Sequence, residues 1–202
     1  ESVNVKTVAF QKIYQQYGNE VVSKVIKHHL SNGGISRFEK FKLYHNKFLG
    51  IQLKKQQLME LSDEFSKLVV QNVIDAPYVP GAFEFIKNNY KNYDYFISTG
   101  TPQDEMINII NKKQLNNYFN SIYGSPEEKT KHVKKIIYEN AYSKDEVIFI
   151  GDADTDILAA KDNDISIILR VHDDSHCNYN YNKIIKVIDL INIIDVLSSI
   201  KN

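Results

Sequence analysis

Apolar residues recur at helical spacing over the first third of the chain. Between residue 3 and about residue 75 they lie three or four positions apart, so that each set falls on one face of a helix. The clearest sets are Val5, Val8, Ala9 and Ile13, and Leu58, Leu61, Phe65 and Leu68. Because a helix with one apolar face packs against others, the pattern predicts four helices and no strand in this region.

After residue 75 the pattern changes to short apolar runs that alternate with helical segments. The runs cover residues 93–98, 121–124, 147–151 and 165–170. Such alternation is typical of a parallel sheet with helices between its strands. Pro77, Pro80 and Gly81 separate the two patterns, since Pro80 suits the first turn of a following helix. We therefore expect a helical domain over residues 1–78 and an α/β core over residues 79–202.

Composition limits the partners of the protein. Its 202 residues include 25 basic and 25 acidic side chains, so the net charge attracts neither nucleic acid nor an anionic membrane. No apolar run is long enough to span a bilayer, and the first residues lack the order of a signal peptide. Cys177 is the only cysteine, which excludes an intrachain disulfide. These features predict a soluble, cytoplasmic protein, and they leave its oligomeric state open.

Three aspartates follow the apolar run at residues 147–151. Asp152, Asp154 and Asp156 come at the point where a strand gives way to a helix. One aspartate there would cap the helix, whereas three crowded carboxylates repel one another unless a cation lies among them. Mg²⁺ prefers oxygen ligands of this kind. The segment therefore favours a metal site at Asp152 and Asp156, with helix capping as the alternative.

Two further strand ends carry groups that suit a phosphate. Ser98, Thr99, Gly100 and Thr101 precede a helix, and hydroxyl and backbone N–H groups in that position can cradle a phosphate or simply cap the helix. Lys129 opens another helix, where a cation opposes the helix dipole unless an anion lies nearby. An exposed, solvated lysine is the alternative. Ligands bind at the carboxyl ends of parallel strands, so together these groups indicate phosphoryl transfer.

The order of three segments resembles the haloacid dehalogenase superfamily. "FISTGT", "GSPEEKTKH" and "FIGDADTD" are similar to its second, third and fourth motifs, over nearly the whole chain. The resemblance, to the phosphoglycolate phosphatase and β-phosphoglucomutase branch, implies a doubly wound, Rossmann-like parallel sheet with a helical cap. It also implies a Mg²⁺-dependent phosphatase that acts on a small phosphorylated metabolite, such as a sugar phosphate, through an aspartyl-phosphate.

By matching position, the resemblance assigns roles to the residues above. Thr99 would bind the transferring phosphoryl group, with Ser98 as the alternative, and Gly100 and Thr101 would complete its cradle. Lys129 would stabilise the charge of the phosphate and the nucleophile. Asp152 would ligate Mg²⁺, and Asp156 would ligate it or orient its waters and Lys129.

One stretch of the helical region also carries a candidate binding residue. In "NGGISRFEKF" (residues 32–41), Ser36 and Glu39 have the spacing of a capping box, and Arg37 falls in the first helical turn. A cation there suits an anionic ligand, although a solvent-facing arginine is the simpler interpretation. The match to a similar loop in sugar-phosphate mutases of the family implies that Arg37 binds the phosphate that is not transferred.

The first motif of the family consists of two aspartates separated by one residue and followed by glycine. Glu1 and Ser2 match the residues that follow this motif, and the motif itself does not occur in the sequence. It carries the nucleophile on the first, central strand. We therefore expect that strand and the nucleophile to lie before residue 1, and the 202 residues alone to be inactive. Two alternatives stay open: a phosphomutase of the same family, or a non-catalytic module that binds a phosphorylated ligand or a protein.

Overall fold

The computed structural model describes residues 3–171 and 180–200, and Cys177 lies outside them. The chain forms two compact units. The first contains the helical region through Ala76 together with Thr99–Gln114 and Gly124–Pro126. The second contains Pro77–Ser98, Leu115–Tyr123 and the chain from Glu127 onward. The division at residues 78 and 79 that we expect from the sequence stays a prediction.

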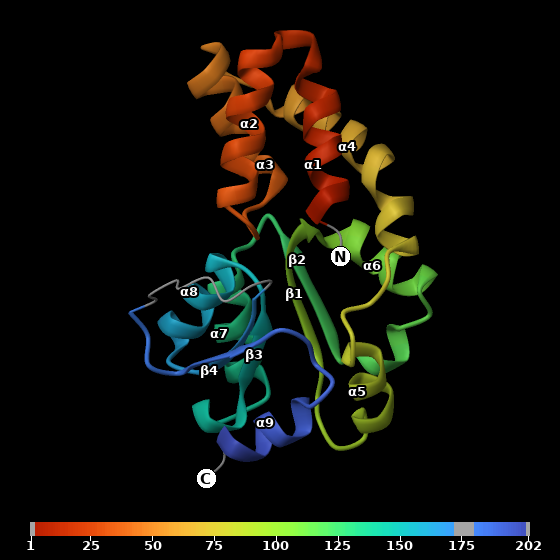
Figure 1. Ribbon diagram of the computed structural model, residues 1–202, viewed down its shortest axis with the longest axis vertical. Coiled ribbons are helices and arrows are strands. Elements are labelled where there is room, and N and C mark those ends of the chain that lie inside the picture. The colour runs from red at the N-terminus through yellow and green to blue at the C-terminus, as the bar shows by residue number, and fades with distance from the viewer. Residues whose placement is uncertain (1–2, 172–179, 201–202) are drawn as a thin grey trace. The chain divides into compact units, whose positions relative to one another are not determined.

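Four α-helices form the helical region (Figure 1). They are α1 (Val3–Tyr14), α2 (Asn19–Ser31), α3 (Arg37–Tyr44) and α4 (Lys55–Asp75). A 3₁₀ turn, η1 (Gln15–Tyr17), follows α1, and a π-helical turn, η2 (His45–Leu49), follows α3. Ser36 caps α3 as predicted, since its hydroxyl accepts the N–H of Phe38 at 3.2 Å. Glu39 bonds to Lys42 instead of reaching back, so the two do not form the full capping box.

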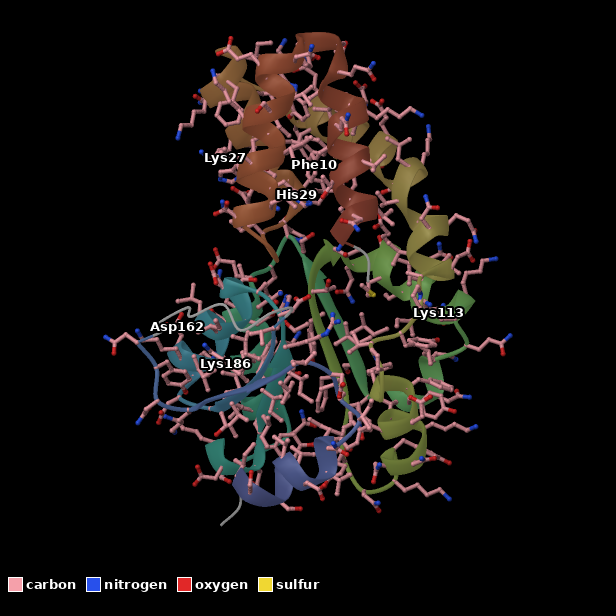
Figure 2. The ribbon with its side chains drawn as sticks, viewed as in Figure 1. Phe10, Lys27, His29, Lys113, Asp162 and Lys186 are labelled. Carbon is pink, nitrogen blue, oxygen red and sulfur yellow. The ribbon has the colours of Figure 1, made fainter. Side chains whose placement is uncertain are left out.

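Aromatic rings fill the centre of this helical region. Phe10 lies within 6 Å, centroid to centroid, of Phe41, Tyr44 and Phe65, which come from α3 and α4. His29 of α2 approaches the same ring at 4.9 Å (Figure 2). Such rings bury large areas and favour tilted contacts, so a few of them hold the helices together.

The second region alternates helices and strands, as its sequence pattern predicts. Its helices are α5 (Ala82–Asn89), α6 (Gln103–Lys112), α7 (Lys129–Glu139), α8 (Asp154–Asn163) and α9 (Ile193–Ile200). Its strands are β1 (Phe96–Pro102), β2 (Ser121–Ser125), β3 (Ile148–Gly151), β4 (Ser166–Arg170) and β5 (Ile184–Val187). The 3₁₀ turns η3 (Asn116–Tyr118) and η4 (Lys144–Glu146) precede β2 and β3. Within the described residues, no helix is both long and apolar enough to cross a membrane.

Strands β3, β4 and β5 form a parallel sheet, and β1 pairs with β2. Ile148 lies opposite Ser166 and Ile168 opposite Ile185, which sets the register of the parallel strands. The α/β class with parallel strands is thus confirmed. The sequence pattern missed β5, although Ile184, Ile185 and Val187 form a short apolar run there.

Both faces of β4 are buried, which explains its continuous apolar sequence. Ile167 and Leu169 pack into a cluster with residues of α7 and α8, such as Val133 and Ile157. Ile168 points the other way and packs with Phe85, Ile193 and Leu197 of α5 and α9. A strand covered on both faces needs apolar residues at every position.

Helix α5 begins at Ala82, so Pro80 lies two residues before the helix and not in its first turn, and Gly81 directly precedes the helix with φ +82°. A Cβ atom at Gly81 would lie only 2.3 Å from the backbone carbon of Leu190. Both its conformation and its surroundings therefore require glycine. This close approach ties the start of α5 to the segment before α9, where the N–H of Leu190 donates to Pro80 O at 2.9 Å.

Candidate active site

The turn between β3 and α8 is built around the side chain of Asp156. This carboxylate is 3% exposed, and its Oδ2 accepts the backbone N–H groups of Asp152 at 3.1 Å and Ala153 at 3.0 Å. A Cβ atom at Gly151 would lie 2.5 Å from the carboxyl carbon of Asp156, so only glycine allows this approach. The aspartate caps its own helix by accepting the free N–H groups at the helix start.

Lys129 at the start of α7 forms a buried ion pair with Asp156. The distance between Nζ and Oδ1 is 2.6 Å, and the two side chains are 11% and 4% exposed. The prediction left open whether Lys129 is solvated or faces an anion, and in the structure it faces Asp156. With one oxygen on Lys129 and the other on two N–H groups, Asp156 fixes the position of the lysine.

Asp152 has a different environment from Asp156. It is exposed, and its carboxylate has no hydrogen-bond or ion-pair partner among the described residues. Asp154, two positions further, is also exposed. In the described parts of the chain, no group of three or more histidine, cysteine, aspartate or glutamate residues could hold a metal ion. Since Mg²⁺ needs only one or two carboxylates and keeps several waters, the available carboxylate of Asp152 fits such a role.

The hydroxyl turn that follows the first apolar run lies within the last residues of β1. Thr99 Oγ1 accepts the backbone N–H of Thr101 at 3.2 Å, so this hydroxyl folds over its own turn. Thr101 itself is buried. A Cβ atom at Gly100 would lie 2.5 Å from the carbonyl oxygen of Gly34, which belongs to the loop before α3. The loop of the helical region and the hydroxyl turn are therefore in direct contact.

Ser98 has a partner that the sequence did not indicate. Its Oγ lies 2.9 Å from Nδ1 of His132, a residue of α7 that is 1% exposed. His132 Nε2 lies 3.8 Å from Glu127 Oε2, and the ring stacks on Tyr123. The only sequence signal was its position one helical turn after Lys129, which places both residues on one face of α7. His132 thus links Ser98 of β1 to the helix that carries Lys129.

Arg37 is buried rather than solvent-facing. Its NH1 and NH2 groups donate to Glu105 of α6 at 2.8 and 2.5 Å, and NH1 also donates to Ser66 Oγ at 2.7 Å. The guanidinium carbon lies 4.5 Å from the ring centroid of Phe65, and the side chain is 5% exposed. Ser66 also donates to Glu105. An anionic ligand would have to displace Glu105 to reach this arginine, and its binding role stays a prediction.

Comparison with known proteins shows the family and the fold of the chain. A family model described as haloacid dehalogenase-like hydrolase matches residues 2–169. No curated protein sequence matches the chain. Among solved structures, β-phosphoglucomutase from Clostridium difficile is similar with a TM-score of 0.76 and 15% identity, over 100% of this chain and 92% of that one.

Two more solved structures share the fold at low sequence identity. A haloacid dehalogenase-like family hydrolase from Streptococcus pneumoniae has a TM-score of 0.68 and 16% identity, over 97% of this chain and 91% of its own. The HAD-hydrolase YfnB from Bacillus subtilis, bound to magnesium, has a TM-score of 0.67 and 14% identity, over 96% of this chain and 91% of its own. At these identities the structures show the fold, a Rossmann-like core with a helical cap. The family match over most of the chain shows more: the chain belongs to the haloacid dehalogenase-like hydrolases.

Proposed function

We propose that the protein is a Mg²⁺-dependent phosphatase that acts on a small phosphorylated metabolite, such as a sugar phosphate. The observation that carries the proposal is the buried Lys129–Asp156 pair, held against backbone N–H groups at a strand end and next to the exposed carboxylate of Asp152. Membership of the family adds the reaction class.

Each residue has a part in the proposed reaction. Lys129 stabilises the negative charge of the phosphoryl oxygens and of the attacking carboxylate, because a buried cation acts strongly at short range. Asp156 keeps Lys129 in place through the 2.6 Å ion pair. Thr99, with Gly100 and Thr101 beside it, is assigned to the transferring phosphoryl group, and Ser98 is the alternative. The attacking aspartate is assigned to the family's first motif, ahead of the matched segments.

Asp152 is assigned to the metal. Its carboxylate is a hard oxygen ligand, whereas both oxygens of Asp156 already have partners. We therefore assign Asp152 to ligating Mg²⁺ and Asp156 mainly to positioning Lys129. When bound, Mg²⁺ would supply positive charge at the phosphoryl oxygens.

Phosphate release by the full-length protein, measured over a panel of phosphorylated metabolites with and without Mg²⁺, tests the proposal. Asp152→Asn should lower the rate by about 10²-fold or more, since one preorganised charge is worth that much. Asp154→Asn is the matched control, because this aspartate is exposed at the same helix start. Release that is unaffected by Mg²⁺ or by Asp152→Asn would refute the metal assignment. Isomerised substrate without released phosphate would indicate a phosphomutase instead.

A further inference from the structure

Helix α7 presents Lys129 in its first turn, and that turn needs support from outside the helix. Its N-cap residue, Glu128, makes no side-chain capping bond with the described residues, and the first turn carries no acidic side chain. A lysine at this end also opposes the helix dipole, so the turn is weak by itself. A contact that fixes this turn therefore also fixes the place of the Lys129 ammonium.

Helix α8 supports one side of this turn. The two helices pack side by side (Figure 1), and Asp156 of α8 pairs with Lys129. The side-chain amide of Asn163, also on α8, donates to the carbonyl oxygen of Thr130 at 3.0 Å. These contacts hold the turn against α8, and they do not connect it with β1 or β2.

His132 makes that second connection. It lies one helical turn after Lys129 on the same face of α7, and it is 1% exposed. Its Nδ1 lies 2.9 Å from Ser98 Oγ on β1, and its ring stacks on Tyr123 of β2 with the centroids 5.6 Å apart. Its Nε2 lies 3.8 Å from Glu127 Oε2, in the loop just before α7. One side chain thus reaches two strands and the loop.

The hydrogen bond to Ser98 gives this contact a direction. The neighbouring buried residues of α7, Val133 and Ile136, are apolar, and apolar packing has no preferred direction. A buried imidazole needs hydrogen bonds to offset the loss of water, and such a bond requires a set distance and angle. In the neutral ring with its proton on Nε2, Nδ1 accepts the Ser98 O–H. The bond therefore limits how far α7 can slide or turn on β1.

We propose that His132 is a positioning residue of the active site, whose hydrogen bond to Ser98 holds the first turn of α7 where Lys129 reaches the phosphoryl group. The inference rests on the proposed function, because it concerns the reaction in which Lys129 acts. His132 is too deeply buried to touch a substrate, so it acts through Lys129. A displacement of about 1 Å can slow a reaction by about 10²-fold, so a small shift of α7 should be visible in kcat.

A stable variant without the hydrogen bond tests the proposal. Ser98→Ala combined with His132→Leu replaces both partners by apolar groups, so no buried polar group loses its partner. We expect this full-length double variant to unfold at the urea concentration of the wild type or higher, while kcat for phosphate release falls about tenfold at unchanged KM. Val133→Ala, at a buried apolar position of α7, is the control: it should lower the urea midpoint and leave kcat unchanged. A double variant as stable and as active as the wild type would overturn the proposal.

His132→Asn is the conservative variant. Its side-chain amide lies close to the place of Nδ1 and can still bond to the Ser98 hydroxyl, so this variant should keep most of the wild-type kcat. It also gives the answer if the double variant does not fold. A folded His132→Asn protein that loses tenfold or more in kcat would contradict the positioning role of the hydrogen bond.

A second background shows whether His132 acts through Lys129. In Lys129→Met there is no ammonium left to place, so His132→Leu should lower the remaining kcat by less than about twofold. Independent effects would multiply instead. A further tenfold loss in the Lys129→Met background would therefore contradict the proposal.

NMR of ¹³C-labelled lysines gives a readout that needs no turnover. Lys129→Met assigns the Lys129 signal, which in the double variant should move toward that of Lys134, an exposed lysine of the same helix. An unchanged Lys129 signal would contradict its placement by His132. A wild-type protein that releases no phosphate from any metabolite contradicts the proposed function, even if this signal moves. An active wild type with an equally active double variant contradicts the positioning role alone.

Discussion

Two buried ion pairs of this chain have similar distances and different surroundings. Arg37 and Glu105 lie 2.5 Å apart in the first unit, and Lys129 and Asp156 lie 2.6 Å apart in the second. Both terminal nitrogens of Arg37 donate to neighbouring oxygens, and Ser66 completes the cluster. Lys129 uses one donor for Asp156, and its other two have no acceptor among the described residues.

The difference separates a structural link from a site that can still bind. The guanidinium of Arg37 donates to Glu105 and Ser66 and so joins α3 to α6 and α4, and a ligand would have to displace Glu105 to reach it. A buried lysine with donors left over, beside the exposed carboxylate of Asp152, can still take a phosphoryl oxygen. We therefore expect mutations of the two pairs to affect different properties, in the following order of size.

Asp156→Asn should have the largest effect on activity. The amide can still accept the two backbone N–H groups but cannot hold Lys129 by charge, so kcat should fall by about 10² to 10³. Asp162→Asn makes the same change on the exposed side of the same helix and should change kcat little. Steady-state phosphate release by both full-length variants measures this, and equal rates would contradict the role of the Lys129 pair.

Glu105→Ala should mainly affect stability. It leaves the Arg37 guanidinium buried without its counter-charge, which costs about 3 to 5 kcal/mol of unfolding free energy. Urea denaturation of the variant and of Glu39→Ala, which breaks an exposed pair on α3, gives the comparison. Replacing both partners with apolar residues, in Arg37→Met with Glu105→Leu, should recover most of the loss. If Glu105→Ala is no less stable than Glu39→Ala, the pair is not a structural link.

The pH dependence of stability should reveal the lowered pKa of Lys40. Burial, and then the charge of Lys6, lower this pKa to about 8 in the folded protein from 10.5 in the unfolded chain, so between these values the unfolded chain binds more protons. Stability should therefore rise with pH across that window, by roughly 3 kcal/mol. In Lys40→Met this rise should disappear. Denaturation at several pH values from 7 to 10.5 gives the free energy of unfolding at each pH. If this free energy changes with pH equally in both proteins, Lys40 ionises normally.

Ser98→Ala should have the smallest effect. It removes the hydroxyl that lies 2.9 Å from His132 Nδ1, which costs about 1 to 3 kcal/mol because the buried histidine loses a partner. Thr99→Ala, one residue further, should lower phosphate release with less change in stability. Measuring the free energy of unfolding and the rate of phosphate release for both variants distinguishes the roles of the two hydroxyls. If only Ser98→Ala lost activity, Ser98 and not Thr99 would be the residue that binds the phosphoryl group.

Much of the candidate site was visible in the sequence because strand ends are local features. Gly151, Asp152 and Asp156 stand in a short segment whose pattern of strand, glycine and helix already places the carboxylates at the carboxyl end of β3. Lys129 stood out because a cation at a helix start needs a reason. Strand β5 was missed because its four residues follow a polar stretch that has no periodicity.

The partners of these residues were not visible, because they come from distant positions. Nothing near Arg37 in sequence indicates Glu105, which lies 68 residues further along the chain, and the same holds for Ser98 and His132, 34 residues apart. A periodic pattern says which face of a helix is buried, but not which charge meets it there. For the same reason, the sequence could not show that a carboxylate lies against Arg37.

The sequence by itself determined the class of the fold, the order of its elements apart from β5 and the residues at the strand ends, because hydrophobic spacing and chain neighbours decide these. Only the tertiary structure decided which charges are buried, which are paired and which donors are left over. Burial makes these choices matter, since a charge away from water must find a partner or be neutralised by losing or gaining a proton.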